Sequence, residues 1–294
     1  MRWWEVLSSL FRLYPRNLQL ATFNLQLIIR HEVPLNSSLL IPNSSFLIPN
    51  LTIFPLYAKL IFGGDCVDEI TIKPVAYIKN AYKEKFGVPR QSGLAPSVKS
   101  EIEFCEGFTD ENIIRGIEQY SHLWLLWGFS KNNGQWSPTV RPPRLGGNKR
   151  VGVFATRSPF RPNGLGLSCV KLESVKKSGN GIALIVSGAD LSDNTPIYDI
   201  KPYLPYVDSI PEAVGGFSDE HKDDFIQVEF SENAKGVLSD EELENLSEIL
   251  SLDPRPSYQD DENRIYGLSF YDFQVKFRVE NQKIYVIEIT GDKN

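Results

Sequence analysis

The sequence predicts a mainly β protein, with an antiparallel, barrel-like domain and a flanking helix, followed by a small α+β subdomain. Most apolar segments after residue 69 are short and rich in aromatic and β-branched residues, as strands are. Only one helical pattern lies among them, so the sequence does not alternate strands with long helices as a doubly wound sheet does. A second helical pattern, with a hairpin of its own, follows residue 208. We therefore divide the chain into residues 1–69, 70–207 and 208–294.

In the middle region, strands are expected over residues 70–76, 121–129, 150–156, 166–175 and 182–187. The segment SHLWLLWGF (121–129) is the clearest buried strand, because it is short, apolar and rich in aromatic residues. A helix is expected from Thr109, as N-cap, to about Tyr120, with acidic residues in its first turn and isoleucines on one face. A long loop rich in proline, glycine and arginine separates the strand at 121–129 from the one at 150–156.

In the C-terminal region, Ser239 and Glu242 have the spacing of a capping box that opens a helix. Leu243, Leu246 and Leu250 give that helix an apolar face. Residues 264–279 and 283–289 are expected to form a hairpin around residues 280–282.

Residues 1–69 differ from the rest of the chain. Residues 33–58 carry no charge but contain four prolines, which excludes a membrane-spanning helix, and no signal-peptide layout precedes them. Met1 is the only methionine, and Gly63-Gly64-Asp65 can be encoded by a ribosome-binding sequence in front of Val67. We expect translation to start at Val67 and residues 1–66 to be translated upstream DNA. The alternative is a genuine but disordered extension.

Charge and cysteine content narrow the function classes. The net charge of −6 argues against a nucleic-acid partner, yet no acidic residue lies between Glu118 and Glu173, where eight lysines and arginines gather. This distribution indicates a local face for an anionic ligand, whereas a merely solvated surface is the plainer alternative. The three cysteines and three histidines are scattered, so we expect no disulfide framework, no metal site and a reducing, cytoplasmic location.

The common nucleotide-binding motifs are missing. Gly164 and Gly166 form a GxG, but no third glycine follows and no βαβ unit surrounds it, so a Rossmann site is not expected. For these two glycines we prefer a turn and close packing.

Three other segments carry candidate functional residues. In RPPRLGG (141–147), prolines stiffen a loop with two arginines, which suits ligand contact, although solubility would also explain it. In GVFATRSPFRPNGLGLS (152–168), a strand leads into a loop with Arg157, Arg161 and Asn163, and arginine forks suit carboxylate or phosphate. In DNTPIYDIKPYLPYVD (193–208), alternation places Asp199, Lys201 and Tyr203 on one face. A structural ion pair of Asp199 with Lys201 or a nearby arginine is the alternative there.

Together with PRQSGL (89–94), these motifs resemble the TsaA/TrmO family in order and spacing. The motifs in question are PRQSGL, SHLWLLW, TVRPPRLGG, GVFATRSPFRPNGLG and DIKPYLPY, and the likeness continues through DPRPSY (253–258) and the last hairpin. It covers about residues 70–291 and leaves out the N-terminal segment. Motifs of this length and number are highly specific.

The resemblance implies a TsaA-like β-barrel methyltransferase, unlike the Rossmann class, that acts as a homodimer. It implies S-adenosylmethionine as methyl donor, and as substrate the tRNA anticodon loop with N6-threonylcarbamoyladenosine at position 37, usually in a threonine tRNA. Carried over by position, the cofactor-binding residues are Gln91, Ser92, Gly93, Leu94, Ser130, Lys131, Arg157, Leu167, Gly188, Ala189, Asp190 and Leu191. Ser130 and Lys131 replace a different polar pair of the family, and Asn194 stands where glycine is usual, which is compatible with a positive-φ turn.

The chemistry suggests roles for the remaining residues. The acceptor nitrogen must lose a proton, and Asp199, our catalytic candidate, or Asp190 could accept it if its pKa is tuned towards neutrality. Positioning, with the proton lost to solvent, is the alternative. The expected substrate-binding residues are Arg141, Arg144, Lys149, Arg150, Arg161, Asn163, Lys201 and Tyr203. Trp136, Phe160 and Tyr203 could stack on splayed bases, although packing is the default for any single aromatic residue.

Two other functions remain open. The chain could be a non-catalytic module that senses S-adenosylmethionine or docks RNA, and it would then tolerate loss of Asp199. It could also be a methyltransferase that acts on another metabolite or RNA. The acid-free basic stretch favours a polyanionic substrate and therefore tRNA.

Overall fold

The computed structural model describes residues 70–294 except 133, 179–180, 222–223, 256–260, 262 and 292–294. The expectations for residues 1–69, including the start at Val67, lie outside the described residues. Within the described part of the chain, no helix is long and apolar enough to cross a membrane. Residues 70–294 belong to one compact unit.

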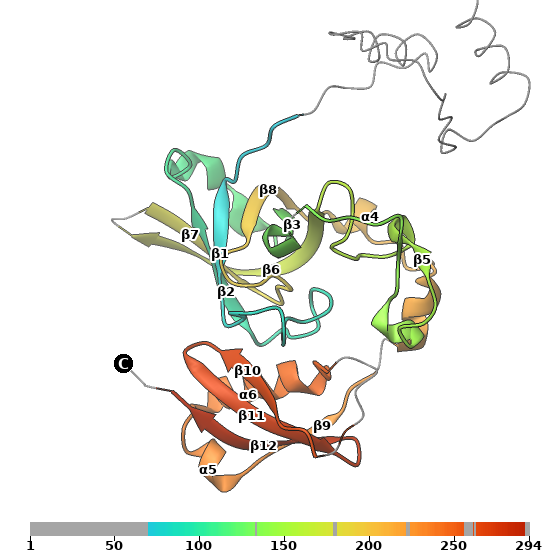
Figure 1. Ribbon diagram of the computed structural model, residues 1–294. Coiled ribbons are helices and arrows are strands. Elements are labelled where there is room, and N and C mark those ends of the chain that lie inside the picture. Colours follow the sequence, from blue (N-terminus) through green and yellow to red (C-terminus); the bar gives the residue numbers. More distant parts are fainter. Residues whose placement is uncertain are drawn as a thin grey trace, which may run out of the picture. The chain divides into compact units, whose positions relative to one another are not determined.

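Six antiparallel strands form a closed barrel in the order β1-β2-β7-β6-β3-β8 (Figure 1). They are β1 (Ala76–Lys79), β2 (Lys99–Phe104), β3 (His122–Gly128), β6 (Leu165–Ser178), β7 (Gly181–Ser187) and β8 (Pro196–Pro202). The ladder closes because β8 pairs with β3 on one side and with β1 on the other. The prediction of a mainly β protein is confirmed.

Alternating burial along the strands builds the barrel core. In β3, Leu123, Leu125 and Trp127 are buried, whereas Trp124 and Leu126 are only half-buried. Since successive side chains of a strand point to opposite faces, β3 faces the core with one set and a partly open surface with the other. The expected strand at residues 121–129 is therefore confirmed.

The helix expected from Thr109 to Tyr120 is wrong. The segment instead forms two 3-10 turns, η1 (Glu111–Ile114) and η2 (Ile117–Gln119). Asp110, not Thr109, is the N-cap and accepts a hydrogen bond from the Asn112 backbone N–H. Gly116 adopts a left-handed φ of 88° between the turns, which an α-helix cannot contain.

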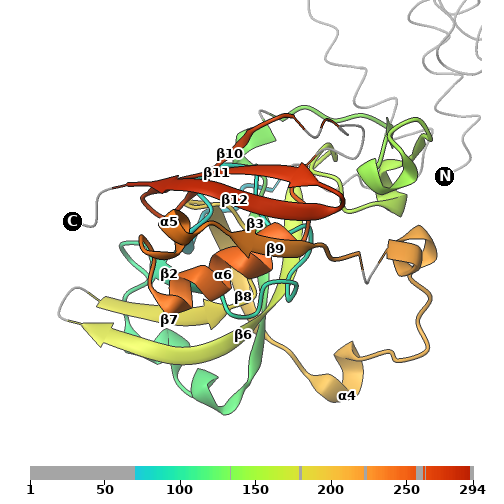
Figure 2. The same cartoon turned by 90° about the horizontal axis from the view of Figure 1, so that it is seen from below.

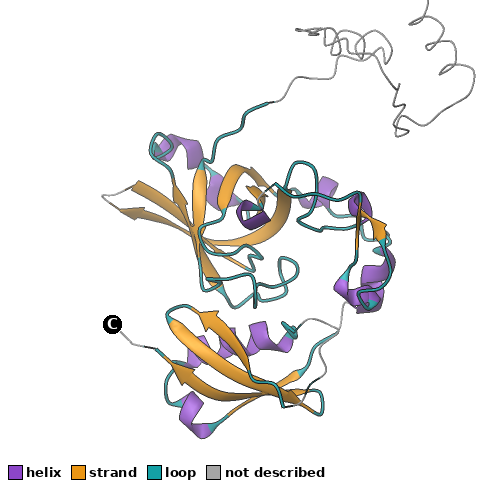
Figure 3. Ribbon diagram, viewed as in Figure 1, coloured by secondary structure: helices purple, strands orange, loops and turns teal. Residues whose placement is uncertain are grey.

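Two strands also begin or end elsewhere than expected. The strand predicted at residues 70–76 is observed instead as β1, over residues 76–79. The pairing of this strand with β2 and with β8 begins at Ala76. The strand predicted at residues 150–156 reduces to β5 (Val151–Gly152), paired with β4 (Thr139–Val140). Figure 3 shows that loops and short helices make up most of this part of the chain. The short helices after β3 are η3 (Ser130–Asn132), η4 (Pro143–Leu145), η5 (Val153–Ala155), α4 (Pro205–Asp208) and η6 (Gly216–His221).

The C-terminal part is a four-stranded sheet in the order β10-β11-β12-β9, with helix α6 packed against it (Figure 2). Its elements are β9 (Gln227–Phe230), α5 (Glu232–Lys235), α6 (Asp240–Ser251), β10 (Tyr266–Phe270), β11 (Phe273–Glu280) and β12 (Lys283–Thr290). The predicted capping box is present, with reciprocal bonds between Ser239 and Glu242. The single strand expected at residues 264–279 is wrong, because a turn with a positive φ at Tyr271 divides it into β10 and β11.

The segment between β1 and β2 packs with the C-terminal part rather than with the barrel core. Ala81, Tyr82, Ala95 and Val98 are buried in the hydrophobic core that α6 and the four-stranded sheet form. The domain boundary at residues 207/208 stays a prediction. The β1–β2 segment lies before that boundary in the sequence, yet it contributes side chains to the hydrophobic core of the C-terminal part.

Candidate functional site

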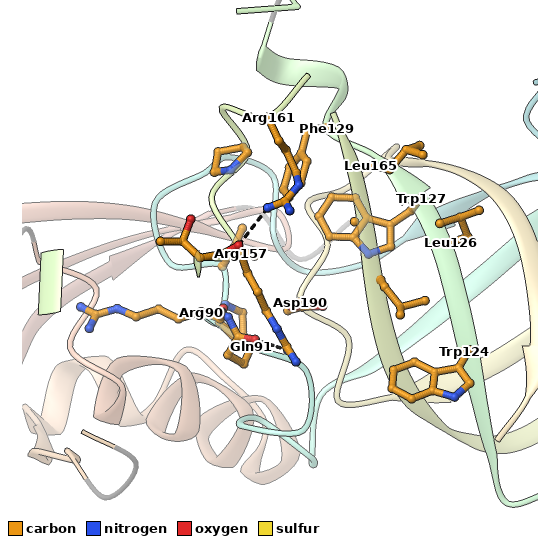
Figure 4. A pocket seen from close by; sticks show the side chains of 16 residues that line it. Arg90, Gln91, Trp124, Leu126, Trp127, Phe129, Arg157, Arg161, Leu165 and Asp190 are labelled. Carbon is orange, nitrogen blue, oxygen red and sulfur yellow. Dashed lines mark hydrogen bonds between the residues drawn. The ribbon is translucent and has the colours of Figure 1, made fainter. Parts of the chain in front are cut away.

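A pocket of about 500 Å³ opens beside strands β3 and β6 (Figure 4). Its lining residues are Val88, Pro89, Arg90, Gln91, Trp124, Leu126, Trp127, Phe129, Thr156, Arg157, Pro159, Arg161, Leu165, Gly166, Leu167 and Asp190. These come from the β1–β2 segment, strand β3, the loop before β6, the start of β6 and the loop after β7. Pockets of this size accommodate a ligand as large as a drug molecule or a nucleotide.

Aromatic and aliphatic side chains of β3 and β6 form one wall of the pocket. Trp127 packs edge-on against Phe129 with 4.4 Å between ring centroids. Gly166 pairs with Trp127 in the β3–β6 ladder, and a Cβ at Gly166 would overlap the indole ring. Close packing is therefore the role of Gly166, as the sequence indicated, while Gly164 adopts a positive φ in the turn before β6.

A carboxylate of the loop after β7 is joined to this wall by a chain of hydrogen bonds. The Trp127 indole N–H donates to Ser168 Oγ at 2.8 Å, and Ser168 Oγ donates to Asp190 Oδ1 at 2.5 Å. Burial raises the pKa of Asp190 above its ordinary value, although the Ser168 hydrogen bond and the charge of Arg157 oppose the shift. The pocket thus holds a carboxylate that is more basic than an exposed aspartate.

Opposite this wall lies Arg157, which Figure 4 shows extending towards Gln91. The Arg157 guanidinium donates to Gln91 Oε1 at 2.5 Å. Arg161 supports the loop beneath it by donating to the Thr156 carbonyl at 2.9 Å and to the Ser158 carbonyl at 3.3 Å. A guanidinium held beside an apolar wall suits an anionic ligand group such as a carboxylate.

Two loops that are far apart in sequence meet at the edge of the pocket. The Gly93 N–H donates to the Gly188 carbonyl at 2.8 Å, and both glycines have a positive φ. A Cβ at Gly188 would lie 3.2 Å from the Gly93 Cα, so this close approach requires glycine. The contact joins the predicted cofactor loops 91–94 and 188–191.

The structure brings only some of the predicted cofactor residues to the pocket. Gln91, Arg157, Leu167 and Asp190 line it. Ser92, Gly93, Leu94 and Gly188 belong to the two joined loops, while Ala189 and Leu191 lie in the barrel core. Ser130 and Lys131 are not among its lining residues. Lys131 instead exchanges hydrogen bonds with the segment after β1, namely with the Lys83 carbonyl and the Lys85 ammonium.

The structure does not bring Asp199 into the pocket. Its carboxylate lies on β8 and pairs with the Lys201 ammonium at 2.9 Å, with 45% of the Asp199 side chain exposed. This environment matches the alternative of a structural ion pair. Tyr203, the third member of the predicted face, packs against Trp124 with 5.7 Å between ring centroids.

The predicted substrate-binding cations lie mostly outside the pocket. Arg141 and Lys149 are exposed, as is Asn163, and Arg150 donates to Thr139 Oγ1 at 2.8 Å. Arg144 lies in η4, and its side chain is outside the described part. Trp136 and Phe160 are 56% and 43% exposed, so neither is a buried packing residue.

The residues that shape the pocket wall are not among the site residues predicted from the sequence. The sequence predicts Trp124, Trp127 and Phe129 only as part of a buried strand and predicts no role for Ser168. One feature of the sequence points to this wall. Trp124 and Trp127 lie on opposite faces of the strand, which indicates that both faces are covered. Among the described residues, no cluster of three histidine, cysteine or acidic side chains could hold a metal.

Comparison with known proteins identifies the family. Residues 77–209 match the tRNA-methyltransferase O N-terminal domain, and residues 223–292 match the TrmO C-terminal domain. The tRNA (adenine(37)-N6)-methyltransferase of Escherichia coli K12 is 42% identical over 214 residues, which cover 70% of this chain and 91% of that one. A putative S-adenosylmethionine-dependent methyltransferase of Pseudomonas aeruginosa is 39% identical, over 75% of this chain and 98% of that one.

A solved structure supports the same assignment. The crystal structure of TrmO from Pseudomonas aeruginosa superposes with a TM-score of 0.63 at 33% identity, covering 76% of this chain and 100% of that one. The two family domains and this fold therefore agree with the resemblance seen in the motifs. The chain belongs to the TrmO family of S-adenosylmethionine-dependent tRNA methyltransferases.

Proposed function

We propose that the chain methylates N6 of adenosine 37 in a tRNA whose adenosine 37 already carries the N6-threonylcarbamoyl group. The names of its relatives support a tRNA methyltransferase with S-adenosylmethionine as donor, and the E. coli relative is named for N6 of adenine 37. The threonylcarbamoyl group, a threonine tRNA, a homodimer and a cytoplasmic location belong to the same proposal and rest on the family resemblance.

The pocket residues fit the donor. Arg157 would pair with the amino-acid carboxylate, and the faces of Trp124 and Trp127 would attract the positive sulfonium. Backbone groups of the joined loops 91–94 and 188–191 would hold the adenosine part. When bound, S-adenosylmethionine supplies an electrophilic methyl group, so the protein has to orient the acceptor and manage a proton.

The observation that carries the proposal is the Asp190 carboxylate inside the pocket. The acceptor nitrogen is conjugated to the purine and to the carbamoyl group, so its lone pair is weak. Its proton must leave as the nitrogen–carbon bond forms, and a carboxylate of raised pKa is suited to accept it. Ser168 and Trp127 would hold Asp190 in place. Asp199, the catalytic residue expected from the sequence, forms an ion pair with Lys201 outside the pocket, which favours Asp190 for this role.

The exposed cations outside the pocket are proposed to bind the tRNA backbone. Arg141, Lys149 and Arg150 would contact phosphates of the anticodon loop, and Trp136 and Phe160 would stack on its bases. The assignments of Arg144, Asn163, Lys201 and Tyr203 to substrate and of Leu94, Ser130 and Lys131 to the donor remain predictions. Arg161 is proposed to act mainly through the loop that carries Arg157.

Nucleoside mass spectrometry tests this proposal. The purified chain is incubated with S-adenosylmethionine and threonine tRNA that carries threonylcarbamoyladenosine, with unmodified tRNA as control. We expect one added methyl on the modified nucleoside and none in the control. A methyl on another nucleoside would mean a different substrate. No methyl on any nucleoside, with donor binding confirmed, would instead favour the non-catalytic binding module.

A further inference from the structure

The segment between β1 and β2, residues 81–98, has two faces. On one side Val88, Pro89, Arg90 and Gln91 line the pocket. On the other side, residues of the same segment are buried in the core of the C-terminal subdomain, among them Tyr82 and Val98. The pocket wall and the second hydrophobic core therefore share this stretch of chain.

Helix α6 holds this segment through one carboxylate. Glu248 Oε2 accepts hydrogen bonds from the Ser97 backbone N–H at 3.0 Å and from Ser97 Oγ at 2.6 Å. Both bonds are part-buried, and a carboxylate that accepts two donors in such a place gives stronger bonds than a neutral acceptor would. Glu248 itself is not among the residues that line the pocket.

The end of α6 provides a second attachment. Asp253 ends the helix region with a φ of 48°, and its carboxylate accepts a two-pronged contact from Arg255 at 2.8 and 2.9 Å. Its backbone carbonyl accepts a hydrogen bond from the Arg90 guanidinium at 2.8 Å. Arg90 adjoins Gln91, which binds Arg157 in the pocket. Asp253, the first residue of the DPRPSY motif, is thus connected to the pocket through Arg90.

Packing leaves this segment little freedom to shift. Gly87 has a φ of 89°, and a Cβ there would overlap Leu268 of β10. Phe86 stacks on Phe277 with 6.3 Å between ring centroids. Tyr82 forms a β-bridge with Phe270, which extends the edge of the four-stranded sheet. A displacement of α6 or β10 would therefore displace the residues that line the pocket.

We propose that the C-terminal subdomain sets the affinity of the pocket for S-adenosylmethionine, and that Glu248 is the positioning residue through which α6 holds the pocket segment. The inference rests on the proposed function, because it takes the pocket as the donor site. Coupling between two sites is reciprocal, so donor binding must in turn stabilise α6.

Titration of Glu248 variants with S-adenosylmethionine, monitored by tryptophan fluorescence, tests whether Glu248 sets the affinity for the donor. We expect Glu248→Ala to raise the Kd for S-adenosylmethionine about 10-fold. We expect Glu248→Gln, which keeps an oxygen acceptor for Ser97, to stay within about 3-fold of wild type. The matched control is Glu288→Ala, which removes an exposed carboxylate paired with Lys276 in the same subdomain and should leave the Kd unchanged. Methyl transfer at saturating donor should change little in Glu248→Ala, so KM for the donor rises while kcat is kept.

Hydrogen exchange on the wild-type protein tests whether donor binding stabilises α6. Adding S-adenosylmethionine should slow amide exchange in α6, although no residue of α6 lines the pocket. If Glu248→Ala does not fold, Ser97→Ala replaces it, since it removes only the hydroxyl bond and should raise the Kd by a smaller factor.

Three outcomes overturn the inference. A folded Glu248→Ala variant with wild-type donor affinity would do so, and so would unchanged exchange in α6 on donor binding. Failure of the wild-type chain to bind the donor would overturn the proposed function together with this inference. In the first two outcomes the wild-type chain still binds the donor, so they overturn only this inference and leave the proposed function standing.

Discussion

The pocket wall and the basic segment of residues 130–155 are built in different ways. In the wall, β3 and β6 pair residue by residue from His122 to Gly128, and Ser168 beneath it is only 1% exposed. The basic segment consists of short 3-10 turns and the two-residue strands β4 and β5, and its described cations are exposed. A carboxylate that hydrogen-bonds to a rigid ladder, as Asp190 does to Ser168, keeps a fixed position, whereas contacts to a phosphate backbone tolerate an irregular, solvated surface.

The largest expected effect concerns Asp190, which the wall holds through Ser168. Asp190→Asn keeps an oxygen acceptor for Ser168 but removes the basic carboxylate. We expect the rate of methyl transfer to fall about 100-fold or more, while the Kd for the donor changes far less. Single-turnover assays with saturating donor measure the rate. Asp199→Asn is the control variant, because the Asp199 carboxylate pairs with Lys201 outside the pocket and its loss should leave the rate unchanged. An inactive Asp199→Asn with an active Asp190→Asn would restore Asp199 as the catalytic residue.

The next effect concerns Arg157, which lies across the pocket from the wall. Arg157→Ala removes the guanidinium that contacts Gln91, and we expect the Kd for S-adenosylmethionine to rise about 10-fold. Arg157→Lys should be intermediate, because it keeps the charge but loses the planar fork. Calorimetric titration of the donor would decide this. Equal affinity in all three proteins would show that Arg157 does not hold the donor.

A smaller effect is expected in the basic segment. Arg141→Ala and Lys149→Ala should each weaken tRNA binding several-fold and lower the slope of log K against log salt by about 1. Both side chains are exposed, so donor affinity should stay at the wild-type value. Filter binding at several salt concentrations gives the slope. An unchanged slope would assign the tRNA contacts to another surface.

The smallest expected effect is on stability. Because burial raises the pKa of Asp190 in the folded protein, the folded state holds that proton more tightly than the unfolded chain does. The stability linked to this group is therefore greatest below the unfolded pKa and is lost as pH rises through the folded pKa. Asp190→Asn should be at least as stable as wild type at neutral pH, with a smaller advantage in acid. Thermal melts between acid and neutral pH would show it, and the opposite trend would contradict a raised pKa.

Errors in the predicted elements have identifiable physical causes. The helix at residues 109–120 failed because Gly116 takes a left-handed conformation, which periodicity does not reveal. Strand β9 was not predicted because it is four residues long and is stabilised by parallel pairing with β12. By contrast, the capping box of α6 and the aromatic strand β3 were predicted correctly, because their signals are local.

The sequence by itself determined the mainly β class, the family and the loops that carry the candidate site, since these depend on local patterns and on long motifs. Only the tertiary structure decided which residues meet. Ser168 and Asp190 are 22 residues apart, Gln91 and Arg157 are 66 apart, and Ser97 and Glu248 are 151 apart. Hydrogen bonds over such separations depend on how the closed sheet and the second core bring segments together, and no periodicity of the chain encodes them.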